Sequence, residues 1–468
     1  MTTHADSIVY QPAVQLANAI ALRRLRSVEL VELFLERISR HDVKLHAFVD
    51  VYADDARAAA AAADQAIGAG HAVGPLHGVP IALKDLIDIE GRITCGGSKA
   101  WAQRVSPVTA TLARRLISAG LIVIGKTHTV EFAMGGWGTN QHLGTPWNPW
   151  DSGQHRAPGG SSAGSGVAVA AGLAPWAIGT DTGGSVRLPA GWCGLTGLKT
   201  TIGRVSVHGV LPLSSTLDTP GPMCRSVADA AALYNVIHGP DPDDPRTLGH
   251  GVNDPLPTLD AGIAGLRLAR MPDSERDGVQ SDVLDAYDAS LEVLSSLGAR
   301  IVDVKLPIPF GAMATIVGKI IGAEGYALIG DMVEDAKLPL DDDVRPRILI
   351  GKNISARDYL LVLEERERIK ALYRDALRDA DALLTPTIAT TAPTLESIDQ
   401  SSTPAHFTRV VNLLDYCALA LPNGIDGNGL PISLQVICRG YEEALALRIG
   451  RAYERATDWH KATPADFP

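Results

Sequence analysis

Residues 158–187 read PGGSSAGSGVAVAAGLAPWAIGTDTGGSVR, and this stretch decides the fold. Two clusters of glycine and serine, residues 158–166 and 179–187, enclose an apolar run that only Gly172 and Pro175 interrupt. Gly/Ser mixtures are typical of flexible linkers, but a linker would rarely adjoin such an apolar run so closely. A phosphate-binding loop is a second alternative, but neither cluster has the GxxxxGK[ST] spacing. The residues alone leave a linker and a catalytic loop open.

The segments around this stretch alternate between short apolar runs, glycine-rich turns and helical patterns. Such alternation predicts an α/β fold with a mostly buried sheet. We find no repeats and no convincing linker, so we expect one large domain over residues 1–468. The strands are expected at residues 79–83, 121–124, 301–304 and 383–384, and the helices after an N-cap at Ser27, at residues 54–67 and 283–294, and around Tyr453.

Composition excludes several classes of function. The net charge of −11 repels polyanions, so we expect no direct contact with nucleic acid or with an acidic membrane. The five cysteines are scattered, without a CxxC pair or a zinc-like Cys/His spacing, so we expect free thiols and neither a metal nor a cofactor. The apolar run at residues 167–178 is too short to cross a bilayer, and the N-terminus lacks a secretory pattern. We therefore expect a cytoplasmic protein.

Ser185 lies where a nucleophile would be useful. Gly183 and Gly184 can adopt backbone angles closed to other residues, so successive N–H groups can point at one spot. Such a group of donors stabilises the oxyanion that forms during acyl transfer. A serine at the end of this turn would have its nucleophile beside its own oxyanion hole.

A serine nucleophile also needs a base. The chain has 13 histidines, but neither cluster has the GxSxG form that accompanies many Ser-His-Asp triads, and no histidine stands out. Lys84 ends the apolar run of residues 79–83, and a lysine that emerges from a buried strand is costly unless it is paired or neutral. A surface lysine at the end of a strand is the simpler interpretation of Lys84 alone.

Several motifs together resemble the amidase-signature family of hydrolases. They are Gly78–Asp85, Gly125–Thr127, Glu131–Gly135, Gly159–Ser162, Asp181–Ala190, Cys193–Lys199, Gly429–Pro431 and Leu434–Val436. The resemblance spans most of the chain. It implies an α/β fold with a large mixed central sheet covered by helices on both faces. It also implies a helical N-terminal segment (residues 1–70), a core (residues 74–230) and a variable segment (residues 308–360) that helps to cover the site.

The resemblance implies a role for each matching residue. Lys84 corresponds to the general base, Ser161 to a serine that follows a cis peptide bond, and Ser185 to the nucleophile. The backbone N–H groups of Thr182, Gly183, Gly184 and Ser185 would form the oxyanion hole. Ala163 replaces a usual glycine, which would matter only if this position needed a positive φ. Asp181, Arg187, Lys199 and Glu131 are expected to support the scaffold.

These roles imply amide hydrolysis through an acyl-enzyme, in which neutral Lys84 accepts the proton of Ser185 through Ser161. We expect a small aryl or aliphatic amide as substrate, and Met134 and Trp137 could line its pocket or pack in the core. As partners we expect a small-molecule amide substrate, no direct contact with nucleic acid and no membrane, although a homodimer is allowed. Two alternatives remain: the glutaminase component of a tRNA-dependent amidotransferase, and a hydrolase of ureido compounds such as allophanate or biuret. An inactive binding module on the same fold is the alternative from another class.

Overall fold

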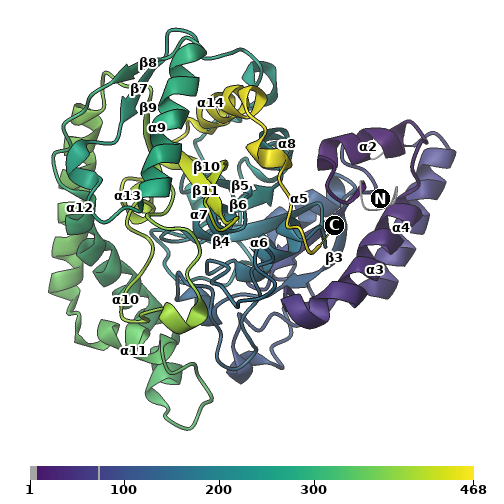
Figure 1. The fold of residues 1–468 in the computed structure, drawn as a ribbon. Helices are drawn as coiled ribbons and strands as arrows, with labels where there is room; N and C mark the ends of the chain where they lie inside the picture. The colour runs from purple at the N-terminus through teal and green to yellow at the C-terminus, as the bar shows by residue number, and fades with distance from the viewer. Residues whose placement is uncertain (1–7, 72–73, 468) are drawn as a thin grey trace.

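A single large sheet organises the molecule (Figure 1). The computed structural model describes residues 8–71 and 74–467, so residues 1–7, 72–73 and 468 of the expected domain lie outside the described residues. Within the described residues the sheet has eleven strands, in the order β1-β3-β2-β4-β6-β5-β10-β11-β9-β7-β8. These strands are β1 (Phe48–Val51), β2 (Pro80–Lys84), β3 (Ile122–Thr127), β4 (Trp176–Asp181), β5 (Thr196–Lys199), β6 (Thr219–Cys224), β7 (Arg267–Arg270), β8 (Arg300–Val302), β9 (Ala382–Pro386), β10 (Cys417–Ile425) and β11 (Pro431–Cys438).

The sheet is mixed, as the resemblance implies. β3, β2 and β4 run parallel near one edge, as do β9, β7 and β8 near the other, while the strands between β4 and β9 pair antiparallel. Ala82 pairs with Ala177 and Leu83 with Ile178, so the C-terminal ends of β2 and β4 meet at one edge of the sheet. This register brings Lys84 close to Thr180 and Asp181.

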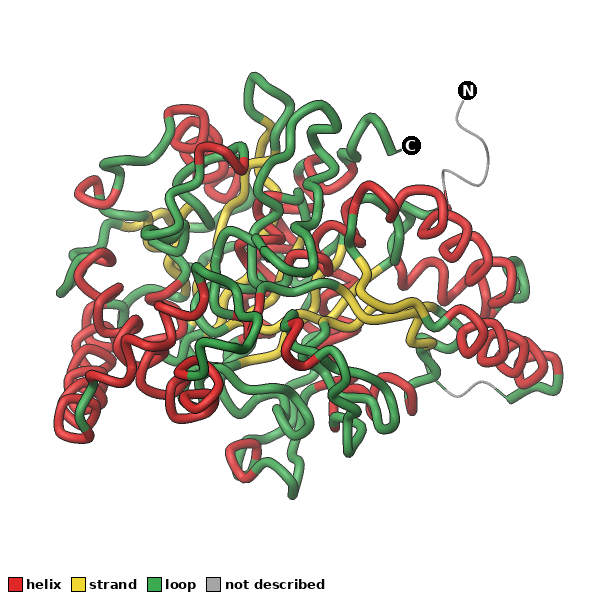
Figure 2. The backbone as a smooth tube through the Cα atoms, turned by 90° about the horizontal axis from the view of Figure 1, so that it is seen from below, coloured by secondary structure: helices red, strands yellow, loops and turns green. Residues whose placement is uncertain are grey.

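Helices cover both faces of this sheet, because the central strands direct buried side chains both ways. Gln435 of β11 contacts Arg187 at the start of α7, whereas Leu419 of β10 lies beside Gly450 of α14. Figure 2 shows the strands passing through the interior with helices and loops around them. The helices are α2 (Ala13–Ala21), α3 (Ser27–Leu45), α4 (Ala53–Gly68), α5 (Thr111–Ser118), α6 (Ala163–Ala170), α7 (Arg187–Trp192), α8 (Val227–Ile237), α9 (Ser281–Ser296), α10 (Phe310–Glu334), α11 (Val344–Leu349), α12 (Ala356–Ala376), α13 (Arg409–Leu413) and α14 (Glu443–Ala456).

The elements expected from the sequence are present, with one change at a helix start. Ser27 was expected to cap α3 but is its first residue, because its hydroxyl donates to Gly78 O at 2.6 Å instead of capping the helix. The alanine-rich segment forms α4, and β8 begins one residue before the expected strand. Ala163, the departure from the family motif, begins α6 and has no positive φ.

Helix α10 was missed as an apolar segment. Its 25 residues are long and apolar enough, by length and composition, to cross a membrane. Lys319 and Glu324 interrupt its apolar residues, so no long uninterrupted apolar run marks this helix in the sequence. Buried residues of α10 such as Val317 and Ile320 join the main hydrophobic core, and the helix packs against α11, α12 and α13. The part of α10 that packs into the core therefore accounts for much of its apolar composition.

All five cysteines are free and buried. Burial raises the pKa of the Cys95 thiol to about 12, and it raises the pKa values of the Cys193, Cys224, Cys417 and Cys438 thiols further. The thiols are therefore protonated and unreactive in the folded protein.

Candidate active site

Lys84 lies at the centre of the site, at the C-terminal end of β2. Its side chain is fully buried. The amine Nζ donates hydrogen bonds to Ser161 Oγ at 2.7 Å and to Thr180 Oγ1 at 2.8 Å. Lys84 is therefore a fixed interior amine and not the exposed lysine of the simpler interpretation.

Burial changes the charge that Lys84 carries. Desolvation lowers the pKa of Lys84 from its ordinary value to about 7, although the charges of Asp218 and Asp181 oppose this shift. A large share of the amine is thus neutral near pH 7. A neutral amine can accept a proton, as a general base must.

Ser161 is held rigidly beside this amine. The Gly160–Ser161 peptide bond is cis. Ser161 O accepts hydrogen bonds from Val130 N at 3.2 Å and from Thr129 Oγ1 at 3.0 Å. The neighbouring Ser162 is tied to β4, since its hydroxyl contacts both the N–H and the carbonyl of Thr180. Ser161 therefore presents its hydroxyl to Lys84 from a fixed backbone.

Ser185 lies on the loop between β4 and α7. Its backbone oxygen accepts from Ser162 N at 3.3 Å, so the two serine-bearing segments are joined. In the part of the chain that the structure describes, no hydrogen bond links the hydroxyls of Ser185 and Ser161. Ser185 is 8% exposed and lines a cavity, whereas Lys84 and Ser161 lie behind it. A substrate can therefore reach Ser185 from this cavity.

The loop before Ser185 differs from the expected oxyanion hole at one residue. Gly184 N donates to Asp181 Oδ1 at 2.8 Å, so this N–H group is engaged and points away from the cavity. Within the described ranges, the N–H groups of Thr182, Gly183 and Ser185 have no intramolecular acceptor, and these three residues line the cavity. The expectation that Gly184 N belongs to the oxyanion hole is therefore wrong, because this N–H group donates to the Asp181 carboxylate instead.

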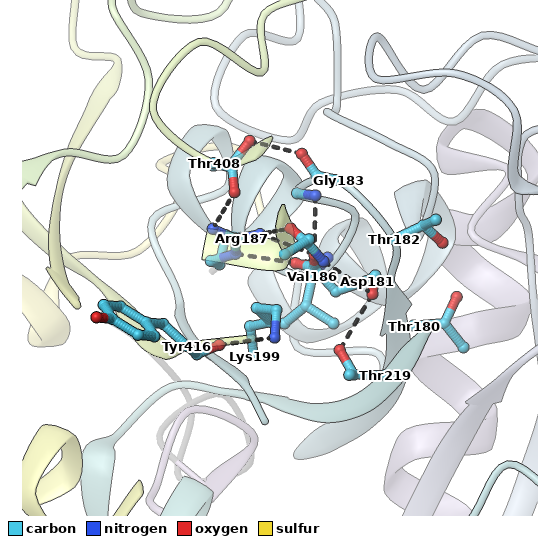
Figure 3. Close-up of polar contacts among 12 residues, drawn as sticks. Thr180, Asp181, Thr182, Gly183, Val186, Arg187, Lys199, Thr219, Thr408 and Tyr416 are labelled. Carbon is cyan, nitrogen blue, oxygen red and sulfur yellow. Dashed lines mark hydrogen bonds and ion pairs between the residues drawn. The ribbon is translucent and has the colours of Figure 1, made fainter. Parts of the chain in front are cut away.

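Asp181 and Arg187 support this loop from below (Figure 3). Arg187 makes two hydrogen bonds to the Asp181 carboxylate and three to Thr408 O, Gln435 Oε1 and Asn412 Oδ1. The guanidinium holds the pKa of Asp181 well below its usual range, against the effect of burial. Both residues act as scaffold, as expected.

Lys199 and Glu131 are also built into the scaffold. Lys199 Nζ donates to Thr200 O and to Tyr416 O, the second bond being visible in Figure 3, and burial lowers the pKa of Lys199 to about 8. Glu131 accepts from Ser98 Oγ at 2.7 Å and from Asp341 N at 2.7 Å. Glu131 therefore fixes the segment of residues 308–360 to the core.

The cavity in front of Ser185 has a volume of about 230 Å³. Met134 and Trp137 line it, and Trp137 stacks on Trp192 with the ring centroids 5.7 Å apart. The segment of residues 308–360 contributes Gly318, Ile321, Arg347 and Ile350 to the wall of this cavity. A second, more apolar cavity of about 290 Å³ shares Ala133, Thr182 and Leu213 with the first.

Sequence reasoning missed the polar residues that distant segments contribute to this wall, namely Arg347, Gln400, Ser401, Ser402, Thr403 and Arg409. They are more than 150 residues away from Ser185 along the chain. The only sequence signal is weak: Arg409 stands directly before the apolar pair Val410 and Val411.

The site contains no evident metal centre. Among residues 8–71 and 74–467, no group of three or more His, Cys, Asp and Glu side chains is arranged to hold a metal ion. The chemistry that the site offers is acyl transfer, since it combines a serine at a cavity, a neutral amine and free backbone donors.

Known proteins similar to this chain include amide-hydrolysing enzymes. The Amidase family model matches residues 29–447. One relative, a subunit of the glutamyl-tRNA(Gln) amidotransferase of Gloeobacter violaceus, is 36% identical over 480 aligned positions, which cover 96% of this chain and 97% of the relative. The peptide amidase from Stenotrophomonas maltophilia has a TM-score of 0.85 at 30% identity, covering 96% of this chain and 97% of that chain. A chain from a complex described as revealing the origins of an s-triazine catabolic enzyme has a TM-score of 0.89 at 32% identity, covering 95% of this chain and 98% of that chain.

One expectation is overturned by these relatives. The sequence predicted a protein with only a small-molecule amide as partner, without nucleic acid and at most a homodimer. Relatives that align with nearly the whole chain are named as one component of a multi-subunit enzyme of glutamyl-tRNA. The acidic net charge misled the prediction, because charge describes the surface of one chain and not what the other members of an assembly bind.

Proposed function

Since the chain belongs to the amidase family, the amidase-signature hydrolases, we propose that it cleaves an amide C–N bond through an acyl-enzyme on Ser185. The observation that carries this proposal is the hydrogen bond from Lys84 Nζ to Ser161 Oγ at 2.7 Å, made by an amine whose pKa is lowered to about 7. A charged lysine could not act as the base.

Catalysis would begin when Ser185 Oγ attacks the amide carbonyl carbon. Ser185 gives its proton to Ser161 Oγ while Ser161 gives its own proton to neutral Lys84. The N–H groups of Thr182, Gly183 and Ser185 stabilise the oxyanion, and each such donor contributes about 2.7–4 kcal/mol. The relay then returns a proton to the leaving nitrogen, because amines leave poorly as anions. Water attacks the ester by the same route and frees the acid.

This scheme is compatible with the finding that, among the described residues, no hydrogen bond joins the hydroxyls of Ser185 and Ser161. A serine hydroxyl turns about one side-chain bond, and catalytic hydrogen bonds are often open until substrate binds. The hydrogen bond between Ser162 N and Ser185 O keeps the two backbones adjacent, and in this scheme the relay would form by rotation of the serine side chains.

The relatives favour the glutaminase alternative over a small aryl or aliphatic amide. Under this alternative the chain releases ammonia from glutamine for use by partner proteins. The similarity to a peptide amidase favours instead a carboxamide hydrolase, and Met134 and Trp137 would then contact the acyl group. Ureido compounds remain a third option. The free, buried cysteines support a reducing compartment such as the cytoplasm.

Two experiments test the proposal. A fluorophosphonate probe should label the wild-type protein and fail to label Ser185→Ala. A turnover screen of aryl amides, aliphatic amides, glutamine and ureido compounds, with Ser185→Ala as the blank, should detect Ser185-dependent product, and glutamine should be repeated with candidate partner proteins. Equal labelling of Ser185→Ala, or wild-type turnover in Lys84→Ala, would remove that residue from the mechanism.

A further inference from the structure

Two arginines face the same cavity as Ser185. Arg347 and Arg409 line it together with small, polar and apolar residues, and the lining includes neither Asp nor Glu. The cavity therefore presents positive charge to a ligand and no carboxylate to balance it.

Arg409 is the less satisfied of the two arginines. Throughout residues 8–71 and 74–467, its guanidinium makes no hydrogen bond and no ion pair, although the side chain is only partly exposed. An arginine has five N–H donors in a planar fork that suits a carboxylate. The unpaired guanidinium of Arg409 therefore has donors available to a ligand in the cavity.

Arg347 is fixed in place by neutral acceptors. It donates to Met134 O at 3.1 Å, to Gln400 O at 2.6 Å and to Gln400 Oε1 at 2.7 Å. Asp341 and Asp343 influence it electrostatically, but neither lies within ion-pair distance or lines the cavity. The charge of Arg347 instead acts on Arg409, since both burial and this neighbouring charge lower the Arg409 pKa. An anion between the two guanidinium groups would offset both the desolvation of Arg409 and its repulsion from Arg347.

Arg409 is tied to the nucleophile loop by the residue before it. Thr408 Oγ1 donates to Gly183 O at 2.7 Å, and Thr408 O accepts from Arg187 at 2.8 Å (Figure 3). A Cβ built on Gly183 would lie 3.4 Å from Arg409 Cγ and 3.8 Å from Arg409 Nε. The backbone of Arg409 is therefore fixed beside the nucleophile loop and its side chain passes close to Gly183, which places the guanidinium within the same cavity as Ser185.

We propose that the acyl half of the substrate carries a carboxylate and no ammonium group, and that Arg409 binds this carboxylate with help from Arg347. The proposal rests on the proposed function, since it concerns the substrate of Ser185. The names of the relatives favour glutamine, but the cavity lining offers no acidic partner for the ammonium group that glutamine bears beside its carboxylate, so this lining disfavours glutamine as a substrate of the isolated chain. The substrate class is thus the monoamides of dicarboxylic acids and related anionic amides.

A matched set of substrates tests this class with the full-length wild-type chain. The set comprises the monoamides malonamate, succinamate, glutaramate and adipamate, the neutral amides of equal length, and L-glutamine. We expect kcat/KM for at least one monoamide to exceed that of its neutral counterpart by about tenfold or more. Glutaramate, which is glutamine without the ammonium group, should exceed L-glutamine by a similar factor. Equal values for neutral and anionic amides at every length, or a preference for glutamine over glutaramate, would overturn the proposal.

Variants assign the preference to Arg409. Arg409→Met should reduce the ratio of kcat/KM values, anionic over neutral, by about tenfold or more, whereas Arg409→Lys should keep part of it. Arg378→Met is the matched control, because this arginine is 70% exposed on the surface, and it should leave the ratio unchanged. An unchanged ratio in Arg409→Met would contradict the role of Arg409.

Binding separates this inference from the proposed function. Titration calorimetry of the monoamides into Ser185→Ala protein needs no turnover, and the double variant Ser185→Ala/Arg409→Met should bind the best monoamide at least tenfold more weakly. Binding that depends on Arg409, together with no turnover of any amide by the wild-type protein, would support the inference and overturn the proposed function. Ser185-dependent turnover without a carboxylate preference would do the reverse.

Discussion

Asp181 and Arg187, which flank Ser185 in the sequence, form an ion pair. The distance between Arg187 Nη2 and Asp181 Oδ1 is 2.8 Å, and neither side chain is exposed to solvent. The pair does more than neutralise charge, because the Asp181 carboxylate also accepts the N–H groups of Gly184 and Val186. One carboxylate therefore sets the shape of the loop that carries the nucleophile.

Replacing Asp181 by alanine should destabilise the whole protein. The change leaves Arg187 charged and buried, which costs about 3–5 kcal/mol. Urea denaturation monitored by tryptophan fluorescence would measure the free energy of unfolding. Because the pKa of Asp181 is held below its usual range, the stabilisation is complete above the unfolded value of about 3.9 and is lost as the pH falls below it.

The exposed pair Arg378–Asp375 provides the control. Its side chains are 70% and 75% exposed, so Asp375→Ala should change the free energy of unfolding by less than about 1 kcal/mol. Similar losses in Asp181→Ala and Asp375→Ala would show that the buried pair does not support the loop.

The reactivity of Ser185 should follow the charge of Lys84. The amine is a base only when neutral, so the rate of fluorophosphonate labelling should rise with pH and level off above the Lys84 pKa of about 7. The measurement is the second-order labelling rate between about pH 5 and 9. A labelling rate that still rises at about pH 9 without levelling off would mean that the amine keeps a pKa near the ordinary lysine value of about 10.4.

Thr180 should position Lys84 rather than react. Thr180→Val removes the acceptor that lies 2.8 Å from Nζ, and we expect about a tenfold lower labelling rate at its pH plateau. The hydroxyl stabilises the charged amine more than the neutral one, so the midpoint of the pH profile should also move to lower pH. Thr180→Ser should restore both values. Loss of rate in Thr180→Ser equal to that in Thr180→Val would assign the effect to packing instead of the hydroxyl.

Asp218 should tune the same profile through its charge. It is the largest charge contribution that raises the Lys84 pKa, while burial raises its own pKa to about 6. Asp218→Asn removes a negative charge that is present above about pH 6, so the labelling midpoint should fall below that of the wild type.

The buried carboxyl of Asp229 offers a matched control for Asp218. Its pKa is also raised to about 6 by burial, but it does not contribute to the shift of Lys84. Asp229→Asn should therefore leave the midpoint in place. A rise of the midpoint in Asp218→Asn would contradict the electrostatic argument.

The sequence predicted elements whose signals are local. The apolar run before Lys84 and the alanine-rich segment of α4 need no distant contact to be recognised, and both are present. Gly184 was wrongly assigned, since four consecutive N–H groups look equivalent until Asp181 takes one of them. Arg409 could not be found, because the bond that places its neighbour beside Gly183 joins residues 225 positions apart. Local patterns thus predicted these elements, and the family resemblance implied the roles of Lys84, Ser161 and Ser185, which stay predictions, while the substrate-facing wall depends on long-range packing.

The five buried thiols can report on local unfolding of the protein. Cys193 lies behind the nucleophile loop, where its Sγ contacts Pro158 O at 3.4 Å, and its pKa is far above neutrality. Alkylating reagents should therefore modify the chain only through transient openings, at a rate that reports the opening equilibrium. Mass spectrometry of alkylated peptides would then give a map of local stability across the core without any engineered label.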